Sequence, residues 1–443
     1  AAAGTGERGR GVMSLTVFFA ALLVMIAIAI PIGVVFGGIS ILPVLANPAF
    51  PFTVDAAVRS MLNGLNSFPI LAIPLFMLSG VIMAKGGISK RLFNFFAYFI
   101  GNKTAGFPCA AIITCLFYGA ISGSGPATTA AVGAMAIPFL TGMGYDLVFA
   151  SAIVAVAGGL GVIIPPSIPF IVYSSMSNTS TSALFIAGIL PGALIALGLM
   201  VVAWVYCKRH GEDKARLQEN YETIRAQGFG RLLRESSWAL LTPVIILGSI
   251  YGGIASPTEA AGISIFYALF VSLFVYKSMT WRDLLPMLRE GVKTYAAIIF
   301  IIATATTFGR VVSLLQVSGA ISEGVLSLVS GRVGVLLIIN VILLAAGMLM
   351  DPLVSIMILT PILLPLAQTV GINPIHLGIL MVCNLAVGFV TPPMGMNLFV
   401  TSNMTGVPAM SIAKKAAPFI AAFLVCLLLI NFVPQISLLL VGT

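Results

Sequence analysis

The chain has 443 residues, of which 59% are hydrophobic and 8% are charged, and its formal net charge is +9. A soluble domain carries roughly 25% charged residues, so this composition excludes a water-soluble fold, and its apolar content excludes intrinsic disorder. Lys and Arg stand in short connectors rather than on one face, which argues against a nucleic-acid partner and is typical of a protein embedded in a lipid bilayer.

Apolar runs of about 20 residues, such as 15–35 and 184–206, are long enough to cross the hydrocarbon core as helices. A transmembrane barrel would instead alternate apolar and polar residues in segments of about ten. We therefore predict an all-α polytopic membrane protein, in which 45 Gly and 25 Pro indicate broken, re-entrant or closely packed helices. Residues 1–12 are expected to be a linker or a fusion junction ahead of Met13.

Residues 105–140 predict a re-entrant helical hairpin, which enters and leaves the membrane on one side. Its two apolar arms, of about 15 residues each, are short for a full crossing, and the Gly and Pro residues of the tip 121–126 force a turn. The following helix, 147–178, is expected to break at Pro165-Pro166, because consecutive prolines lack the N–H groups that continue a helix.

This break frees the carbonyl groups of residues 161–164, which are costly in hydrocarbon unless something coordinates them. Na⁺ is a hard cation that favours carbonyl, hydroxyl and carboxylate oxygens. Since the tip adds the hydroxyl groups of Ser122 and Ser124, we predict a Na⁺ site where the tip and the break meet. The alternative is a packing kink whose polar groups are satisfied by neighbouring helices.

Residues 208–235 form a polar connector, and its Lys and Arg content predicts a cytoplasmic location. It is interpreted either as a solvated amphipathic segment or as a docking surface for a regulator. Further along, Arg310 lies in an apolar run, where a charge marks function by default. Three roles are open to it: binding a substrate carboxylate, pairing with Asp351, or standing at a hydrated helix end. Helix N-caps are predicted at Asp146, at Asn373 and, within a capping box, at Ser256.

A second hairpin, 333–367, and a second broken helix, 375–404, follow the connector. The tip carries Asp351 where the first tip carries a serine, and the break falls at Pro392-Pro393. We predict a second, chemically unequal Na⁺ site here, in which Asp351 serves either Na⁺ or the substrate. The half-helix after each break is polar, and its N-terminus suits an anionic group. Hydrogen bonds between helices are the alternative role for these polar side chains.

The two halves share one register. Adding 227 to positions in the first half reaches matching Gly and Pro residues in the second, for example from Pro165-Pro166 to Pro392-Pro393. This offset predicts two repeats, 13–207 and 236–443. The basic residues near 85–91 have uncharged counterparts, so equivalent ends carry positive charge in one unit only. That asymmetry predicts that the two units are inverted in the bilayer, as in many secondary transporters.

The tip Ser122–Thr129, the break at Pro165-Pro166-Ser167, the segment Ser256–Ala261 and the break at Thr391-Pro392-Pro393 resemble the large membrane subunit of tripartite ATP-independent periplasmic (TRAP) transporters. The likeness covers nearly the whole chain. It implies an elevator transporter of the ion-transporter superfamily, in the bacterial inner membrane, which uses a Na⁺ gradient to import organic acids such as C4-dicarboxylates and sialic acid. It also implies a small four-helix membrane subunit, separate or fused, and a periplasmic binding protein that delivers the substrate. No organic cofactor is expected.

The resemblance also implies which residues form the sites. For Na⁺ it points at the two tips and the two breaks, with Ser122, Gly123, Ser124, Gly161, Ile164 and Pro165 in one set and Asp351, Gly388, Thr391 and Pro392 in the other. For the substrate we expect polar residues of the tips and half-helices together with the intramembrane arginine: Ser124, Ser167, Ser174, Asn178, Arg310, Asp351, Asn397 and Thr401.

Three alternatives to this interpretation are open. The closest is a stand-alone Na⁺/anion symporter of the same superfamily that needs no binding protein. An enzyme is disfavoured, because no Ser/His/Asp set, HExxH motif or pair of catalytic carboxylates falls within the apolar segments. A channel would conduct without saturation, and two coordinated hairpins suit occlusion better than permeation.

Overall fold

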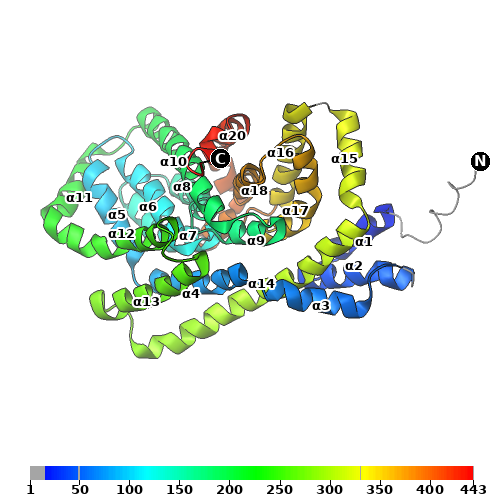
Figure 1. The fold of residues 1–443 in the computed structure, drawn as a ribbon. Helices are drawn as coiled ribbons and strands as arrows, with labels where there is room; N and C mark the ends of the chain where they lie inside the picture. The colour runs from blue at the N-terminus through cyan, green and yellow to red at the C-terminus, as the bar shows by residue number, and fades with distance from the viewer. Residues whose placement is uncertain (1–14, 48–49, 330, 443) are drawn as a thin grey trace, which may run out of the picture.

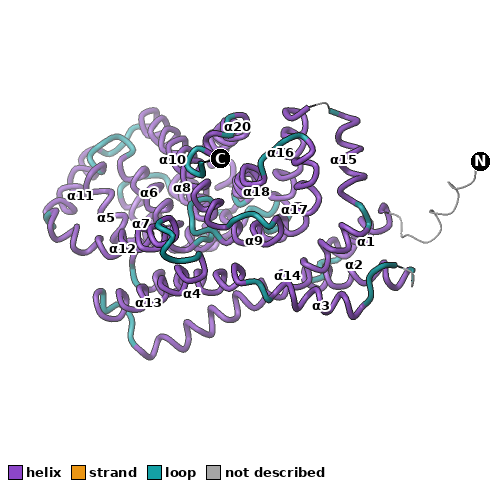
Figure 2. Tube along the Cα trace, in the orientation of Figure 1, coloured by secondary structure: helices purple, strands orange, loops and turns teal. Residues whose placement is uncertain are grey.

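The computed structural model describes residues 15–47, 50–329 and 331–442, so the predicted linker 1–12 lies outside the described residues. Within them the chain forms helices joined by loops and turns, and no strand (Figure 1, Figure 2). Among the helices of this part of the chain, seven are long and apolar enough to cross a membrane. The prediction of an all-α polytopic membrane protein is confirmed.

The helices up to the end of the connector are α1 (Leu15–Ala27), α2 (Ile32–Ala46), α3 (Val54–Leu65), α4 (Ala72–Lys85), α5 (Ile88–Ile100), α6 (Gly106–Ser122), α7 (Gly125–Gly142), α8 (Leu147–Gly158), α9 (Ile168–Ser177), α10 (Thr181–His210) and α11 (Lys214–Ala226). Those that follow are α12 (Phe229–Tyr251), α13 (Pro257–Phe270), α14 (Leu284–Leu314), α15 (Val317–Leu328), α16 (Gly331–Leu349), α17 (Pro352–Thr369), α18 (Pro374–Gly388), α19 (Met396–Thr405), α20 (Ala409–Phe432) and α21 (Gln435–Leu438).

The apolar run 15–35, expected to cross the membrane as one helix, is interrupted in the structure, so that expectation is wrong. α1 ends at Ala27, and α2 begins at Ile32. Between them Ala29 has a left-handed φ of 61°, and Pro31 has no N–H with which to continue a helix. α1 and α2 pack against each other instead of forming one continuous span.

The predicted N-caps are confirmed. The Asp146 carboxylate accepts hydrogen bonds from the N–H groups of the first turn of α8, and the Asn373 amide oxygen accepts one at the start of α18. Ser256 and Glu259 form the reciprocal hydrogen bonds of a capping box at the start of α13. Side-chain acceptors therefore fix where three of the helices begin.

The core forms around two buried helices, α8 and α18, each of which is the first part of a broken helix. Both arms of the first hairpin, α6 and α7, pack against α8, and both arms of the second, α16 and α17, pack against α18. The half-helices beyond the breaks cross over, because α9 packs against α17 and α19 packs against α7. Each hairpin therefore contacts parts of both broken helices, at the centre of the bundle in Figure 1.

The connector lies at one end of the molecule, where α11 packs against α5 (Figure 1). The Glu212 carboxylate accepts hydrogen bonds from the backbone N–H of Ala105 and from the Tyr145 hydroxyl group. Burial, followed by the hydrogen bond to Glu212, raises the pKa of Tyr145, so this hydroxyl remains a donor. The connector is thus tied to both ends of the first hairpin.

The longest helix, α14, runs along the lower edge of the bundle in Figure 1. Its first half packs against α4, where Gly291 lies against Leu78, and its second half packs against α2, α3 and α17. α4 in turn packs against α13. The last turns of α14 therefore border both the second hairpin and the helices at the N-terminal end of the described chain.

Candidate functional site

The tip of the first hairpin gathers three oxygen atoms. Ser122 ends α6 and Ser124 precedes α7, and between them Gly123 has a left-handed φ of 62°, which favours glycine. The Ser122 hydroxyl oxygen lies 2.8 Å from the Thr128 hydroxyl oxygen and 3.3 Å from the Ser124 carbonyl oxygen. Two hydroxyl groups and a carbonyl group are ligand types that a hard cation prefers.

This tip lies directly against the first break. A Cβ atom on Gly161 would stand 2.8 Å from the Ser124 carbonyl oxygen and would also crowd the Thr128 hydroxyl group, so glycine is required there. The backbone N–H of Ile168 donates a hydrogen bond to the Gly123 carbonyl oxygen over 3.3 Å. The predicted Na⁺ residues Ser122, Gly123, Ser124 and Gly161 are therefore neighbours in space.

The first break leaves carbonyl groups without donors. Ser167 caps α9 by accepting from the Phe170 N–H, and its hydroxyl group donates to the Val162 carbonyl oxygen. Within the described chain, no hydrogen bond reaches the carbonyl oxygens of Ile163 and Ile164. The Pro165-Pro166 bond is cis. Ser167 thus satisfies one carbonyl group of the break. The next two accept no hydrogen bond from the described residues, and the Ile163 carbonyl oxygen lies against Gly188 of α10.

The second half shows the same arrangement at its break. Thr391 donates its hydroxyl group to the Val387 carbonyl oxygen, and no hydrogen bond from the described residues reaches the carbonyl oxygens of Val390 and Thr391. These two positions are those reached from Ile163 and Ile164 by the offset of the sequence repeat. The Pro392-Pro393 bond is also cis.

The second tip differs in its chemistry. Asp351 caps α17, because its carboxylate accepts a hydrogen bond of 2.8 Å from the Leu353 N–H. The Met394 N–H donates to the Met348 carbonyl oxygen over 3.2 Å, which joins the end of α16 to the break. A Cβ atom on Gly388 would stand 2.6 Å from the Cα atom of Gly347. A carboxylate therefore stands at the second tip, and the hairpin is in backbone contact with its break.

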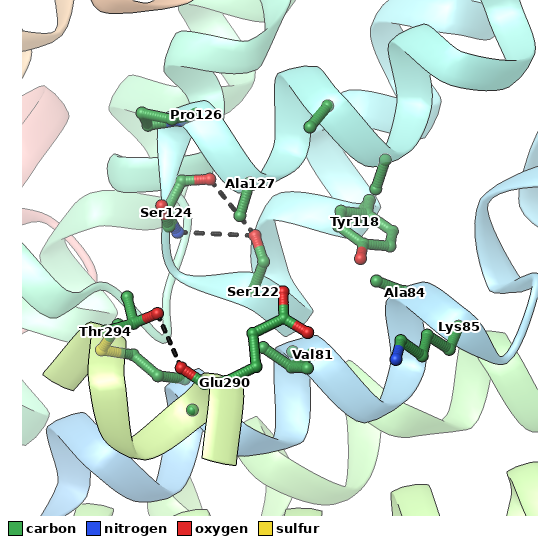
Figure 3. Close-up of a pocket in the computed structure, with 15 residues that line it drawn as sticks. Val81, Ala84, Lys85, Tyr118, Ser122, Ser124, Pro126, Ala127, Glu290 and Thr294 are labelled. Atoms are coloured by element: carbon green, nitrogen blue, oxygen red, sulfur yellow. Dashed lines mark hydrogen bonds between the residues drawn. The ribbon is translucent and has the colours of Figure 1, made fainter. Parts of the chain in front are cut away.

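Both tips line one cavity of about 220 Å³, which we call the tip pocket. Ser124 borders it from the first tip and Asp351 from the second, and Phe389 of the second break and Thr294 of α14 complete its wall. A wider cavity of about 530 Å³ adjoins it and shares Ser124 and Thr294. Figure 3 shows that Ser122 and Ser124 face Glu290 and Thr294 across this wider cavity.

The remaining expected substrate residues do not reach the tip pocket. The Ser174 hydroxyl group bonds with the Thr181 hydroxyl and the Thr179 carbonyl group, so its hydrogen bonds are made within its own segment. Asn397 is fully buried and donates to the Ala155 carbonyl oxygen, and Thr401 donates to its own helix. These contacts match the alternative role of bonding between and within helices.

Arg310 and Asn178 line a third cavity, away from the tips. Arg310 makes no ion pair with Asp351 among the described residues, so the interpretation that pairs these two residues is wrong. The physical reason is their separation: Arg310 stands near the end of α14, whereas Thr294, sixteen residues earlier, is the α14 residue that borders the tip pocket.

Sequence reasoning missed several residues of the site. Thr128 belongs to the tip segment Ser122–Thr129 and lies one helical turn after Ser124. This spacing of four residues could have indicated that the two side chains share a face of the helix. Glu290 and Thr294 gave no signal, because they come from α14, which is distant in the sequence. Pocket walls built from remote helices need tertiary structure to be found.

Two helical hairpins whose tips meet two broken helices at a shared internal cavity define a multi-pass membrane transport protein. A family model described as "Tripartite ATP-independent periplasmic transporter, DctM component" matches residues 19–436, and the chain belongs to this family. It is a transporter permease and not an enzyme.

Relatives of known name are also permeases of TRAP transporters. The isethionate TRAP transporter permease DctMQ of Oleidesulfovibrio alaskensis is 40% identical over 97% of this chain and 66% of its own length. The C4-dicarboxylate large permease DctM of Pseudomonas aeruginosa is 40% identical, over 88% and 90%. The sialic acid large permease SiaM of Vibrio cholerae is 35% identical, over 87% and 89%. The chain thus spans just under two thirds of the isethionate permease.

A solved structure supports the fold alone. The YdaH transporter of Alcanivorax borkumensis superposes with a TM-score of 0.54, covering 94% of this chain and 97% of that chain at 15% sequence identity. The likeness in fold therefore extends over almost the full length of both chains.

Proposed function

We propose that this chain imports a small organic acid across the bacterial inner membrane, driven by an inward Na⁺ gradient. The observation that carries the proposal is the cluster formed by the Ser122 and Thr128 hydroxyl groups and the Ser124 carbonyl group, pressed against the break at Gly161. The carbonyl groups of Ile163 and Ile164, in the same break, receive no hydrogen bond from the described residues. Na⁺ is the cargo that such an oxygen set suits.

The second half offers a second Na⁺ position. Asp351 and the break carbonyl groups of Val390 and Thr391 supply oxygen ligands there, and Asp351 also borders the tip pocket. Importing an anion against a negative-inside potential costs about 2.3 kcal/mol per charge per 100 mV. Two co-transported Na⁺ ions reverse that cost for a monoanion, so two sites match the energetic requirement.

The substrate is proposed to be a small organic anion held in the tip pocket, beside both Na⁺ positions. The relatives are named for isethionate, C4-dicarboxylates and sialic acid, which share an acidic group and a small polar body. The tip pocket, of about 220 Å³, and the adjoining cavity, of about 530 Å³, share Ser124 on their walls and together reach the size of a site for a molecule of this class. Na⁺ bound at the tips would offset the charge of Asp351 toward such an anion.

Transport is proposed to follow an elevator mechanism, in which the hairpins and broken helices move together against the remaining helices. Their mutual packing supports this, because each hairpin contacts parts of both broken helices and forms one unit with them. A periplasmic binding protein would deliver the substrate, and a small four-helix membrane subunit, separate or fused, would accompany the chain. The second candidate is a stand-alone Na⁺/anion symporter of the same superfamily.

The test is uptake into proteoliposomes that contain the chain with its small subunit, supplied with the loaded binding protein. We expect uptake with an inward Na⁺ gradient and none when K⁺ or H⁺ replaces Na⁺. Equal uptake without Na⁺ would overturn the coupling. Undiminished uptake of free substrate without the binding protein would favour the stand-alone symporter.

A further inference from the structure

A separate polar chamber lies between α3, α9 and α14. It has a volume of about 310 Å³. Most of the residues that line it are polar: Ser60, Asn63 and Ser67 from α3 and the loop after it, Ser175 and Asn178 at the end of α9, and Thr306 and Arg310 of α14. We call it the arginine chamber. None of these residues lines the tip pocket or the wider cavity beside it.

The arginine chamber lies at the end of the molecule opposite the connector. Asn178 comes just before α10, a helix of 30 residues, about 45 Å long, whose other end leads into the connector. On α14, Thr294 borders the tip pocket and Thr306 borders the chamber, about 18 Å further along the helix. With the basic connector in the cytoplasm, the chamber faces the periplasm.

The chamber carries an uncompensated positive charge. Arg310 has no carboxylate within ion-pair distance in the described part of the chain, and the acid on α3, Asp55, already pairs with Arg59. Ser60 lines the chamber, and its hydroxyl group makes no hydrogen bond with another of the described residues. A planar guanidinium with free donors around it matches a carboxylate or sulfonate group.

From this geometry we infer a second anion-binding site in the arginine chamber, distinct from the tip pocket. It takes the carboxylate or sulfonate group of the incoming organic anion on the periplasmic side, before the anion reaches the tips. Arg310 provides the charge, and Ser60, Asn63 and Asn178 provide uncharged hydrogen-bonding groups. The site rests on the proposed direction of transport, but its occupancy needs no Na⁺, so the two ideas fail separately.

The test measures charge selectivity at the chamber directly. Asn63 is exposed and lines the chamber, so Asn63→Cys places a reactive thiol there. Four of the five native cysteines are buried, and the wild-type protein, treated in the same way, measures the labelling of the native cysteines. The full complex is treated with a sulfonate-bearing and with a trimethylammonium-bearing methanethiosulfonate reagent, in buffer without Na⁺. We expect the anionic reagent to react roughly tenfold faster, because an unpaired positive charge on the wall of a cavity raises the local concentration of anions.

Two further variants test whether Arg310 is the cause of this preference for the anionic reagent. Asn63→Cys with Arg310→Gln should lose the preference, whereas Asn63→Cys with Arg59→Gln should keep it, since Arg59 is paired and lies outside the chamber lining. Isethionate or succinate at millimolar concentration should slow labelling of Asn63→Cys and of Asn63→Cys with Arg59→Gln, but not of Asn63→Cys with Arg310→Gln. Equal rates for both reagents, or a preference that survives Arg310→Gln, would overturn the site. Protection by unloaded binding protein but by neither anion would also overturn it, in favour of a protein contact.

Discussion

Gly119 and Gly161 touch backbone to backbone: a Cβ atom on Gly119 would stand 2.6 Å from the Cα atom of Gly161. The second half contains a similar contact, where a Cβ atom on Gly388 would stand 2.6 Å from the Cα atom of Gly347. In both halves an arm of the hairpin is therefore seated on the break with no room for a side chain. In the first half this contact keeps the Ser124 carbonyl oxygen and the Thr128 hydroxyl group next to Gly161 of the break.

Replacing Gly388 with Ala is expected to destabilise the protein by at least about 1–3 kcal/mol, because the new methyl group meets backbone atoms that cannot rotate away. The free energy of unfolding, measured in mixed detergent micelles, checks this. Gly142→Ala is the matched control, since a Cβ atom there meets nothing within 4 Å. If both variants unfold alike, the close contact contributes nothing to stability.

Thr128→Val is expected to raise the Na⁺ concentration for half-maximal uptake roughly tenfold, since losing one ligand at a cost of about 1.4 kcal/mol weakens binding by that factor. Valine keeps the shape of threonine, so the hairpin should remain folded. Thr141→Val, on the same helix, is the control, because the Thr141 hydroxyl group bonds only with carbonyl groups of its own helix. An unchanged Na⁺ dependence in Thr128→Val would remove this residue from the proposed site.

The sequence predicted the features that arise locally. Glycine and proline act on their own backbone, so the turn at 121–126 and the break at Pro165-Pro166 were visible without any fold. The contact of Gly347 with Gly388 was not, because it joins residues 41 positions apart that are both embedded in apolar runs. The interruption of 15–35 was missed because hydropathy outweighed a single proline there. Inversion of the two repeats stays a prediction.

Asp351→Asn is expected to reduce Na⁺-driven uptake at least tenfold while leaving the protein folded. An asparagine oxygen can still accept the hydrogen bond from the Leu353 N–H that caps α17, so only the charge is lost. Uptake rate and thermal unfolding are measured on the same preparation. Asp351→Ala removes both functions and should also lower the unfolding temperature. Wild-type uptake in Asp351→Asn would leave this residue with capping as its only role.

Three buried asparagines, Asn340, Asn384 and Asn431, connect α16, α18 and α20. Asn340 is the middle member: its amide group donates to Asn431 over 2.8 Å, and its oxygen accepts from Asn384 over 2.8 Å. Asn340→Leu removes both bonds, at about 1 kcal/mol for each bond lost in a membrane setting. The Asn431 amide oxygen is left without a donor, whereas the Asn384 amide group keeps its hydrogen bond to the Leu380 carbonyl group. Unfolding in mixed micelles should therefore show a loss near 2 kcal/mol.

The triple variant with leucine at all three positions distinguishes this cause from a packing effect. Replacing all three side chains removes the unpaired Asn431 amide oxygen together with Asn384 Oδ1 and Asn431 Nδ2, which have no hydrogen-bond partner among the described residues, so we expect the triple variant to be more stable than Asn340→Leu alone. If the cost came from the larger side chain, the three substitutions would instead add up. An unfolding free energy for the triple variant below that of the single variant would therefore contradict the hydrogen-bond explanation, and would assign the cost to steric overpacking around α18.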